Sequence, residues 1–333
     1  MILSTVAETI YWMARYVERA ENTARIIMVN ANLLLDLPRG IAPGWEPILA
    51  ITSSNQLFYE HYSEPDEKKV VKFMVSDKYN TASILNSLMS ARENLRTVRA
   101  IVPRGAWEVL NDLHYYAQEH KSKVLSRKGR FEYLTHIIRS CQLIAGNISG
   151  SMSHDETYEF VRLGKNLERA DMTTRVLEVR AGNLLPKLAD ELKPFDDIQW
   201  KSILESVAAY QMYRRHVHVR VKGSAVMSYL LQDRQFPRSI AYCVIEVEHC
   251  LRSLPDSEAA LRTLGRLQRL VFEADEKDMV RVKLNQFMNK LQVLLGEVHD
   301  QVELAYYQTE RMKLDTIVTQ ESIDDKNEVI ESV

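Results

Sequence analysis

Two short stretches of this sequence gather acidic and basic residues in a pattern that could do chemistry. They are 14-ARYVERAENTAR-25 and 164-GKNLERADMTTR-175, and the second repeats the first 150 positions later. A glutamate can act as a general base, and an arginine can stabilise negative charge that develops in acyl transfer. Glu18 and Glu168 are therefore the candidate catalytic residues, and Arg19 and Arg169 are candidate ligand-binding residues.

Each stretch also contains a second acid and base with helical spacing. Glu21 and Arg25 stand four residues apart with the acid first, and Asp171 and Arg175 repeat this order. On a helix that order favours an ion pair, so these four residues are predicted to be structural ion pairs.

The Glu-Arg pairs have a structural interpretation as well as a functional one. Arginine can grip a carboxylate through two hydrogen bonds, so the repeated charges can form a partly buried network that joins the two stretches. Buried ion pairs often fail to recover the free energy lost on leaving water. Charges repeated at the border of a core can therefore also mark a site that a substrate completes.

A third charged stretch, 91-ARENLRTVR-99, occurs in the first half of the chain. Arginines at spacings of four and three along one helix face repel one another unless an anion or carboxylates face them. The matching stretch, 247-VEHCLRSLP-255, has Glu248 where the first has Arg92. Duplicated proteins can keep a ligand site in one copy only, so this stretch is a candidate anion-binding site. The alternative is that it is a basic helix face exposed to solvent. The candidate ligand-binding residues here are Arg92, Glu93, Asn94, Arg96 and Arg99.

Composition and motifs exclude several classes of function. The chain has 43 basic and 45 acidic residues and a net charge of −2, which disfavours nucleic acid as a partner. No metalloprotease, hydrolase or nucleotide-binding motif occurs, so we predict no metal and no cofactor. No signal peptide or stretch of about 18 apolar residues is present, so no membrane partner is expected. The three cysteines lack zinc-site spacing and favour a reducing, cytoplasmic location.

The elements that must position these residues are helices. Glycine (11) and proline (9) are scarce among the 333 residues, and Met13, Val17, Ala20, Ala24 and Ile27 draw one apolar stripe at helical spacing. No segment is typical of a strand. The predicted helices span 3–36, 46–60, 79–101, 105–124, 130–148, 155–185, 199–213, 215–232, 236–253, 257–273 and 276–308.

The similarity between the two halves extends beyond the charged stretches. The segment 73-FMVSDKYNTASI-84 matches 229-YLLQDRQFPRSI-240 at an offset of 156, which pairs Asp77 with Asp233 and Ser83 with Ser239. Such self-similarity predicts two fused copies of one helical unit, at 1–150 and 151–310, related by a pseudo-twofold axis. The expected fold is an all-α, large helical bundle. The acidic segment 311–333 is expected to be a flexible tail.

Four segments resemble the alpha-E family of bacterial proteins over residues 1 to about 310. They are 8-ETIYWMARYVERAENTARII-27, 77-DKYNTASI-84, 91-ARENLRTVR-99 and 107-WEVLN-111. The family's usual Asn-Pro-Ser-Ser-Ile segment is altered here to Asn80-Thr81-Ala82-Ser83-Ile84. The resemblance identifies Glu18-Arg19 and Glu168-Arg169 as the family's Glu-Arg motif, without assigning them a reaction.

The resemblance also implies partners. Members of the family are usually encoded beside a circularly permuted ATP-grasp protein and a transglutaminase-like cysteine peptidase. This context favours an accessory or substrate-binding component of a system that forms amides or peptides or modifies peptides, with a peptide or carboxylate ligand. The alternatives are an acyl-transfer or amide-forming enzyme that uses the Glu-Arg residues, and a purely structural helical homo-oligomer.

Overall fold

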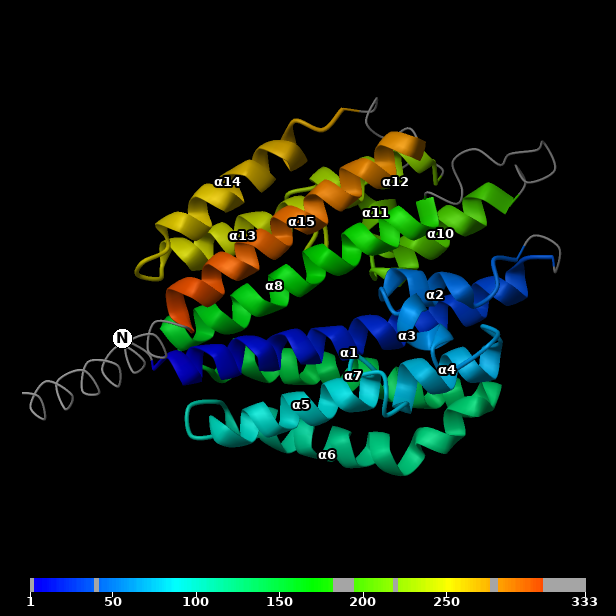
Figure 1. Ribbon diagram of the computed structural model, residues 1–333, viewed down its shortest axis with the longest axis horizontal. Coiled ribbons are helices and arrows are strands. Elements are labelled where there is room, and N and C mark those ends of the chain that lie inside the picture. Colours follow the sequence, from blue (N-terminus) through cyan, green and yellow to red (C-terminus); the bar gives the residue numbers. More distant parts are fainter. Residues whose placement is uncertain (1–2, 39–41, 182–194, 218–220, 276–280, 308–333) are drawn as a thin grey trace, which may run out of the picture.

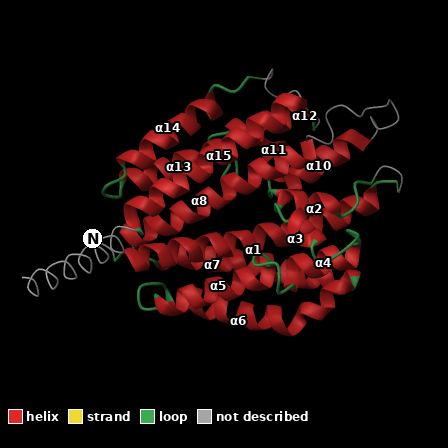
Figure 2. Ribbon diagram, viewed as in Figure 1, coloured by secondary structure: helices red, strands yellow, loops and turns green. Residues whose placement is uncertain are grey.

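The structure, a computed structural model, describes residues 3–38, 42–181, 195–217, 221–275 and 281–307. Within these ranges it contains 14 α-helices, one 3-10 segment and one π-helical segment, and no strand (Figure 2). The all-α prediction is therefore confirmed. The predicted tail at 311–333 lies outside the described residues.

The helices fall into two runs along the chain. The first run is α1 (Ser4–Asp36), α2 (Glu46–Ile51), α3 (Asn55–Tyr59), α4 (Glu67–Ser76), α5 (Ile84–Thr97), α6 (Arg104–His120), the 3-10 segment Lys121–Leu125 and α7 (Arg127–Ser151). The second run is α8 (Glu156–Val176), the π-helical segment Leu177–Ala181, α10 (Asp196–Ser206), α11 (Tyr210–Val217), α12 (Gly223–Gln232), α13 (Ile240–Arg252), α14 (Glu258–Phe272) and α15 (Arg281–Tyr306).

The long helices α1 and α8 lie against each other in the middle of the bundle (Figure 1). Helices α5 and α7 pack on α1, and α6 packs on both of them. Helices α13 and α15 pack on α8, and α14 packs on both of those. The two stretches that contain the Glu-Arg pairs lie on these central helices, 14–25 on α1 and 164–175 on α8, so the fold brings them together.

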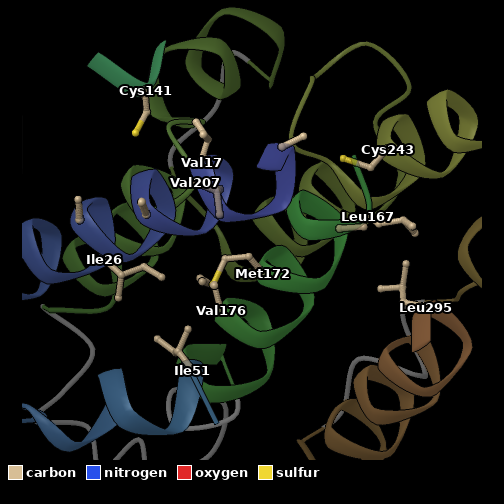
Figure 3. Close-up of a cluster of buried hydrophobic side chains, with 14 of the residues drawn as sticks. Val17, Ile26, Ile51, Cys141, Leu167, Met172, Val176, Val207, Cys243 and Leu295 are labelled. Atoms are coloured by element: carbon tan, nitrogen blue, oxygen red, sulfur yellow. The ribbon is translucent and has the colours of Figure 1, made fainter. Parts of the chain in front are cut away.

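A glycine allows α1 and α8 to approach closely. A Cβ atom at Gly164 would lie 2.4 Å from the backbone oxygen of Tyr11, a separation that packed atoms do not reach. The apolar stripe of α1 continues into this contact, and Ala20, Ala24 and Ile27 are fully buried. Figure 3 shows part of the resulting core, which includes Ile26 of α1, Ile51 of α2 and Met172 and Val176 of α8.

Side-chain caps fix where α5 and α13 begin. Ser83 accepts a hydrogen bond from the backbone of Asn86, and Ser239 accepts one from Tyr242. The helices predicted over 79–101 and 236–253 therefore begin later than expected, at Ile84 and Ile240. An N-cap hydroxyl satisfies a backbone amide that the first helical turn leaves unpaired.

Other differences from the predicted helices are local. The sequence prediction missed α4, which begins after Asp66, whose carboxylate accepts from the backbone of Lys69. The single helix expected over 46–60 is α2 and α3, interrupted at Ser53, whose φ is 52°. The helix expected over 199–213 is likewise divided near Ala208, whose φ is 55°. A left-handed residue cannot continue an α-helix.

Two further expectations concern boundaries and membranes. The boundary predicted between residues 150 and 151 lies in the last turn of α7. Among the described residues, no helix is long and apolar enough to cross a membrane.

Candidate functional site

The Glu-Arg motifs of α1 and α8 pair with each other across the helix contact. Glu168 accepts hydrogen bonds from Arg15 Nε at 2.8 Å and from Arg19 Nε and Nη2 at 2.6 and 3.0 Å. In the opposite direction, Arg169 Nε lies 3.0 Å from Glu18 Oε2. The glutamate of each motif is therefore paired with the arginine of the other.

Arg238 completes the network on the side of Glu18. It lies between α12 and α13, and its Nη1 donates to Glu18 Oε1 at 2.5 Å and to Asn22 Oδ1 at 2.6 Å. Its Nη2 donates to Glu21 Oε1 at 2.9 Å, and Glu21 also accepts a hydrogen bond from Arg25. Arg238 is a member of the network that the sequence did not reveal, because its partners lie more than 200 residues away along the chain.

Both central glutamates are buried and ionised. Burial opposes the charge on Glu168, but Arg19 and Arg15 outweigh that effect and lower the pKa of its carboxyl to about 2. Burial likewise opposes the charge on Glu18, where Arg169 and Arg238 outweigh it and lower the pKa. A carboxylate with so low a pKa takes up protons poorly near neutral pH, so Glu168 is a weak general base.

A cavity of about 210 Å³ lies beside Glu168. One water needs roughly 10–15 Å³ of such space, so the cavity can hold a small molecule or part of one. Helix α8 contributes Glu168, Asp171, Met172 and Arg175, α1 contributes Arg19 and Thr23, the end of α2 contributes Ile51, Thr52 and Ser53, and Ala82 lies before α5.

Charged side chains border this cavity and reach solvent. Arg175 Nε donates to Asp171 Oδ2 at 2.8 Å, and its Nη1 donates to Ser53 Oγ. The side chains of Arg19, Arg175 and Asp171 are 23%, 26% and 22% exposed, whereas that of Glu168 is 3% exposed. The cavity thus gives access to charges that the core mostly encloses.

The arginine-rich stretch lies elsewhere, on α5 and the turn after it. Arg92 donates to Asn111 Oδ1 at 2.9 Å and to Glu93 Oε1 at 2.7 Å, and its guanidinium also lies over Trp107. Arg96 pairs with the same Glu93. The structure therefore places Arg92 against α6, and Arg92, Glu93 and Arg96 all lie apart from the residues that line the cavity.

The last two members of that candidate set, Asn94 and Arg99, lie on α5 and in the turn that follows it. Asn94 donates to the backbone oxygen of Thr9 at 3.2 Å and so joins α5 to α1. Arg99 lies beyond the end of α5 and is exposed. Neither side chain lines the cavity beside Glu168.

Two other groups of reactive side chains lie outside the cavity. The thiols of Cys141, Cys243 and Cys250 are buried and free, and burial raises the pKa of Cys243 to about 12, which disfavours a thiolate nucleophile. On α15, ligand atoms of His299, Asp300 and Glu303 lie within 4.8 Å of one another, close enough to share a metal ion. His299 Nδ1 lies 2.8 Å from the hydroxyl of Tyr11.

Comparisons with known proteins give one family and a few relatives. The model of the alpha-E family, described as a predicted alpha-helical domain with a conserved ER motif, matches residues 2–307. One uncharacterized protein of Mycobacterium bovis and two of Mycobacterium tuberculosis strains are 22% identical to this chain over 327 residues. The matches cover 88% of this chain and 35% of each relative, so the chain spans about a third of their length. No solved structure matches.

Proposed function

Because this chain belongs to the alpha-E family, we propose that its two Glu-Arg motifs build a ligand-binding site, and that the protein is an accessory or substrate-binding component of an ATP-grasp-associated system. The system forms amides or peptides or modifies peptides, and the ligand is a peptide or another molecule that bears a carboxylate. The site is the cavity beside Glu168.

The observation that carries this proposal is the charge around that cavity. Two carboxylates of the lining, of Glu168 and Asp171, pair with two guanidinium groups of the lining, of Arg19 and Arg175, and Glu168 pairs also with Arg15, which lies outside the lining. One positive charge is left over, and Arg19 and Arg175 are partly open to solvent at the cavity. Guanidinium groups recognise carboxylates through paired hydrogen bonds, so a carboxylate ligand would balance the excess charge.

The reciprocal pairing also supports a duplicated architecture. Glu18 forms an ion pair with Arg169, and Glu168 forms one with Arg19, so the same residue types pair in both directions, as across a twofold interface. We take the units as residues 1–150 and 151–310, which meet along α1 and α8.

A partner is proposed on separate grounds. In the mycobacterial relatives the matching region is about a third of a longer chain, which supports a unit that works beside another domain. The proposed partners are a circularly permuted ATP-grasp protein and a transglutaminase-like peptidase in the cytoplasm. The partner would supply the activated substrate, and this chain would hold the acceptor.

The two alternatives fit the site less well. An acyl-transfer or amide-forming enzyme needs a base, and the low pKa values of Glu18 and Glu168 disfavour these carboxylates in that role. A purely structural oligomer would use the repeated charges between chains, whereas here they pair within one chain.

The test combines this chain with the ATP-grasp protein encoded beside it and measures both co-purification and amide formation. The variant Arg175→Gln removes a cavity arginine, and Arg252→Gln removes an exposed arginine with the same four-residue pairing, to Glu248 on α13. We expect both variants to form the complex and only Arg175→Gln to lose product. Equal activity of the two variants would remove the proposed site, and absence of a complex would remove the accessory role.

A further inference from the structure

The loops before α5 and α13 differ at one position that faces the charged network. The segments 80-NTASI-84 and 236-FPRSI-240 match, and their serines cap the two helices in the same way. The residue before the serine is Arg238 in one segment and Ala82 in the other. This difference decides what lies beside the two central glutamates.

Beside Glu18 of α1, the guanidinium group of Arg238 occupies the space between the acidic side chains. Arg238 is 8% exposed and contacts Glu18, Glu21 and Asn22, which are at most 4% exposed. Three hydrogen bonds of 2.5 to 2.9 Å hold this guanidinium between two carboxylates and an amide oxygen. The surroundings of the Glu-Arg motif on α1 therefore accommodate a guanidinium group.

Beside Glu168 of α8, the corresponding space between the acidic side chains is a cavity. The residues 150 positions after Glu18, Glu21 and Asn22 are Glu168, Asp171 and Met172. All three line the 210 Å³ cavity, and so does Ala82. The cavity therefore lies where an arginine side chain at position 82 would extend.

Resting on the proposed function, we propose that this cavity binds the guanidinium group of a ligand between Asp171 and Glu168, while Arg19 and Arg175 receive the carboxylate of the same ligand. The ligand class is free arginine or an arginine residue at the end of a peptide. The guanidinium group of the ligand would pair with Glu168 and Asp171 of α8, as that of Arg238 pairs with Glu18 and Glu21 of α1.

The hydrogen-bonding capacity of the cavity fits a guanidinium. A carboxylate has about four acceptor sites. Glu168 accepts three hydrogen bonds from Arg15 and Arg19, and the Asp171 carboxylate accepts one from Arg175. Asp171 can therefore accept most of the new bonds, with Glu168 adding one.

The charge around the cavity explains why the ligand needs both groups. A guanidinium alone would make four positive charges against the two carboxylates of Glu168 and Asp171. A ligand that brings its own carboxylate offsets the added charge, and Arg19 and Arg175 are the arginines open to it. The same pairing of charges would disfavour ligands that carry only the cationic end.

The test is isothermal calorimetry of the whole chain with L-arginine and L-citrulline at constant ionic strength. Citrulline keeps the length and the carboxylate but replaces the guanidinium by a neutral urea. Because hydrogen bonds to a charged group are stronger than those to a neutral one, we expect arginine to bind at least about tenfold more tightly. The dipeptide Gly-Arg, compared with Gly-citrulline, distinguishes a peptide end from the free amino acid.

A variant supplies an independent check. Ala82→Arg should fill the cavity as Arg238 fills its own and abolish arginine binding, whereas Ala100→Arg, which adds the same charge at an exposed turn, should leave binding unchanged. Equal binding of arginine and citrulline would overturn the guanidinium inference but leave the carboxylate site standing. If neither arginine nor citrulline bound, the inference would be overturned. The proposed function would fail as well only if Arg175→Gln also kept full activity in the amide-formation test. The ligand comparison on the unmodified chain decides the matter even if Ala82→Arg fails to fold.

Discussion

At the scale of single residues, two glutamates that each pair with two arginines should differ greatly in how much they contribute to the stability of the fold. Glu168 is buried with Arg15 and Arg19, whereas Glu93 is 45% exposed with Arg92 and Arg96. Removing one partner of a buried pair commonly costs about 3–5 kcal/mol, and exposed pairs contribute about 0–1 kcal/mol. We expect Glu168→Gln to lower the free energy of unfolding by the larger amount and Glu93→Gln by the smaller, in urea titrations at pH 7. Equal losses would contradict this burial argument.

The same glutamate gives the stability of the protein a defined pH dependence. Its pKa is about 2 in the folded chain and near 4.5 ordinarily, so the unfolded chain binds more protons as the pH falls. The stabilisation is therefore complete above about pH 5 and is lost as the pH falls toward 2. The unfolding free energy of the wild type, measured from pH 7 to pH 3, should fall more steeply than that of Glu168→Gln. Parallel curves would show that Glu168 does not carry this dependence.

The residue scale also shows what the sequence could and could not predict about the site. The pairing of Glu21 with Arg25 depends only on spacing along one helix, which the sequence contains. The pairing of Glu168 with Arg15 and Arg19 depends on how α1 and α8 cross, and no local pattern encodes that. Arg238 had one usable signal, its alignment with Ala82 beside two matched serines, but that signal acquires meaning only when both surroundings are known.

At the scale of helices, the contact between α1 and α8 depends on Gly164. Its replacement by alanine would place Cβ 2.4 Å from the Tyr11 oxygen, so the helices would have to separate, and overpacking of this kind typically costs about 1–3 kcal/mol. Gly146 on α7 is exposed, and a Cβ atom added there would meet no other atom within 4 Å, so Gly146→Ala should stabilise its helix by about 0.5–1 kcal/mol. Thermal unfolding of the two variants should therefore shift in opposite directions.

Helices were predictable where apolar residues recur at helical spacing, as along α1. The missed helix α4 has only 10 residues, and its buried residues Val70, Val71, Phe73, Met74 and Val75 stand close together, so the periodicity of this short apolar run does not distinguish a helix from a buried strand. The break between α2 and α3 arises from a backbone angle at Ser53, which carries no warning in the residue type.

At the scale of the whole molecule, the contact between α1 and α8 should hold the two runs of helices together without the peptide bond that joins them. The connection after α7 is exposed at Ser153, His154 and Asp155, and the buried charges on either side have their partners across the contact. Separation would leave Glu18 and Glu168 without these arginines and expose the surface around Gly164. A protease site inserted between Ser153 and His154 should therefore yield a cut chain that still elutes as one particle in size-exclusion chromatography. The cut chain with Glu168→Gln should dissociate at a higher protein concentration than the cut wild type, because its contact is weaker. Separate elution of the wild-type fragments in native buffer would show that the covalent connection, and not the network of charges, holds the two units in place.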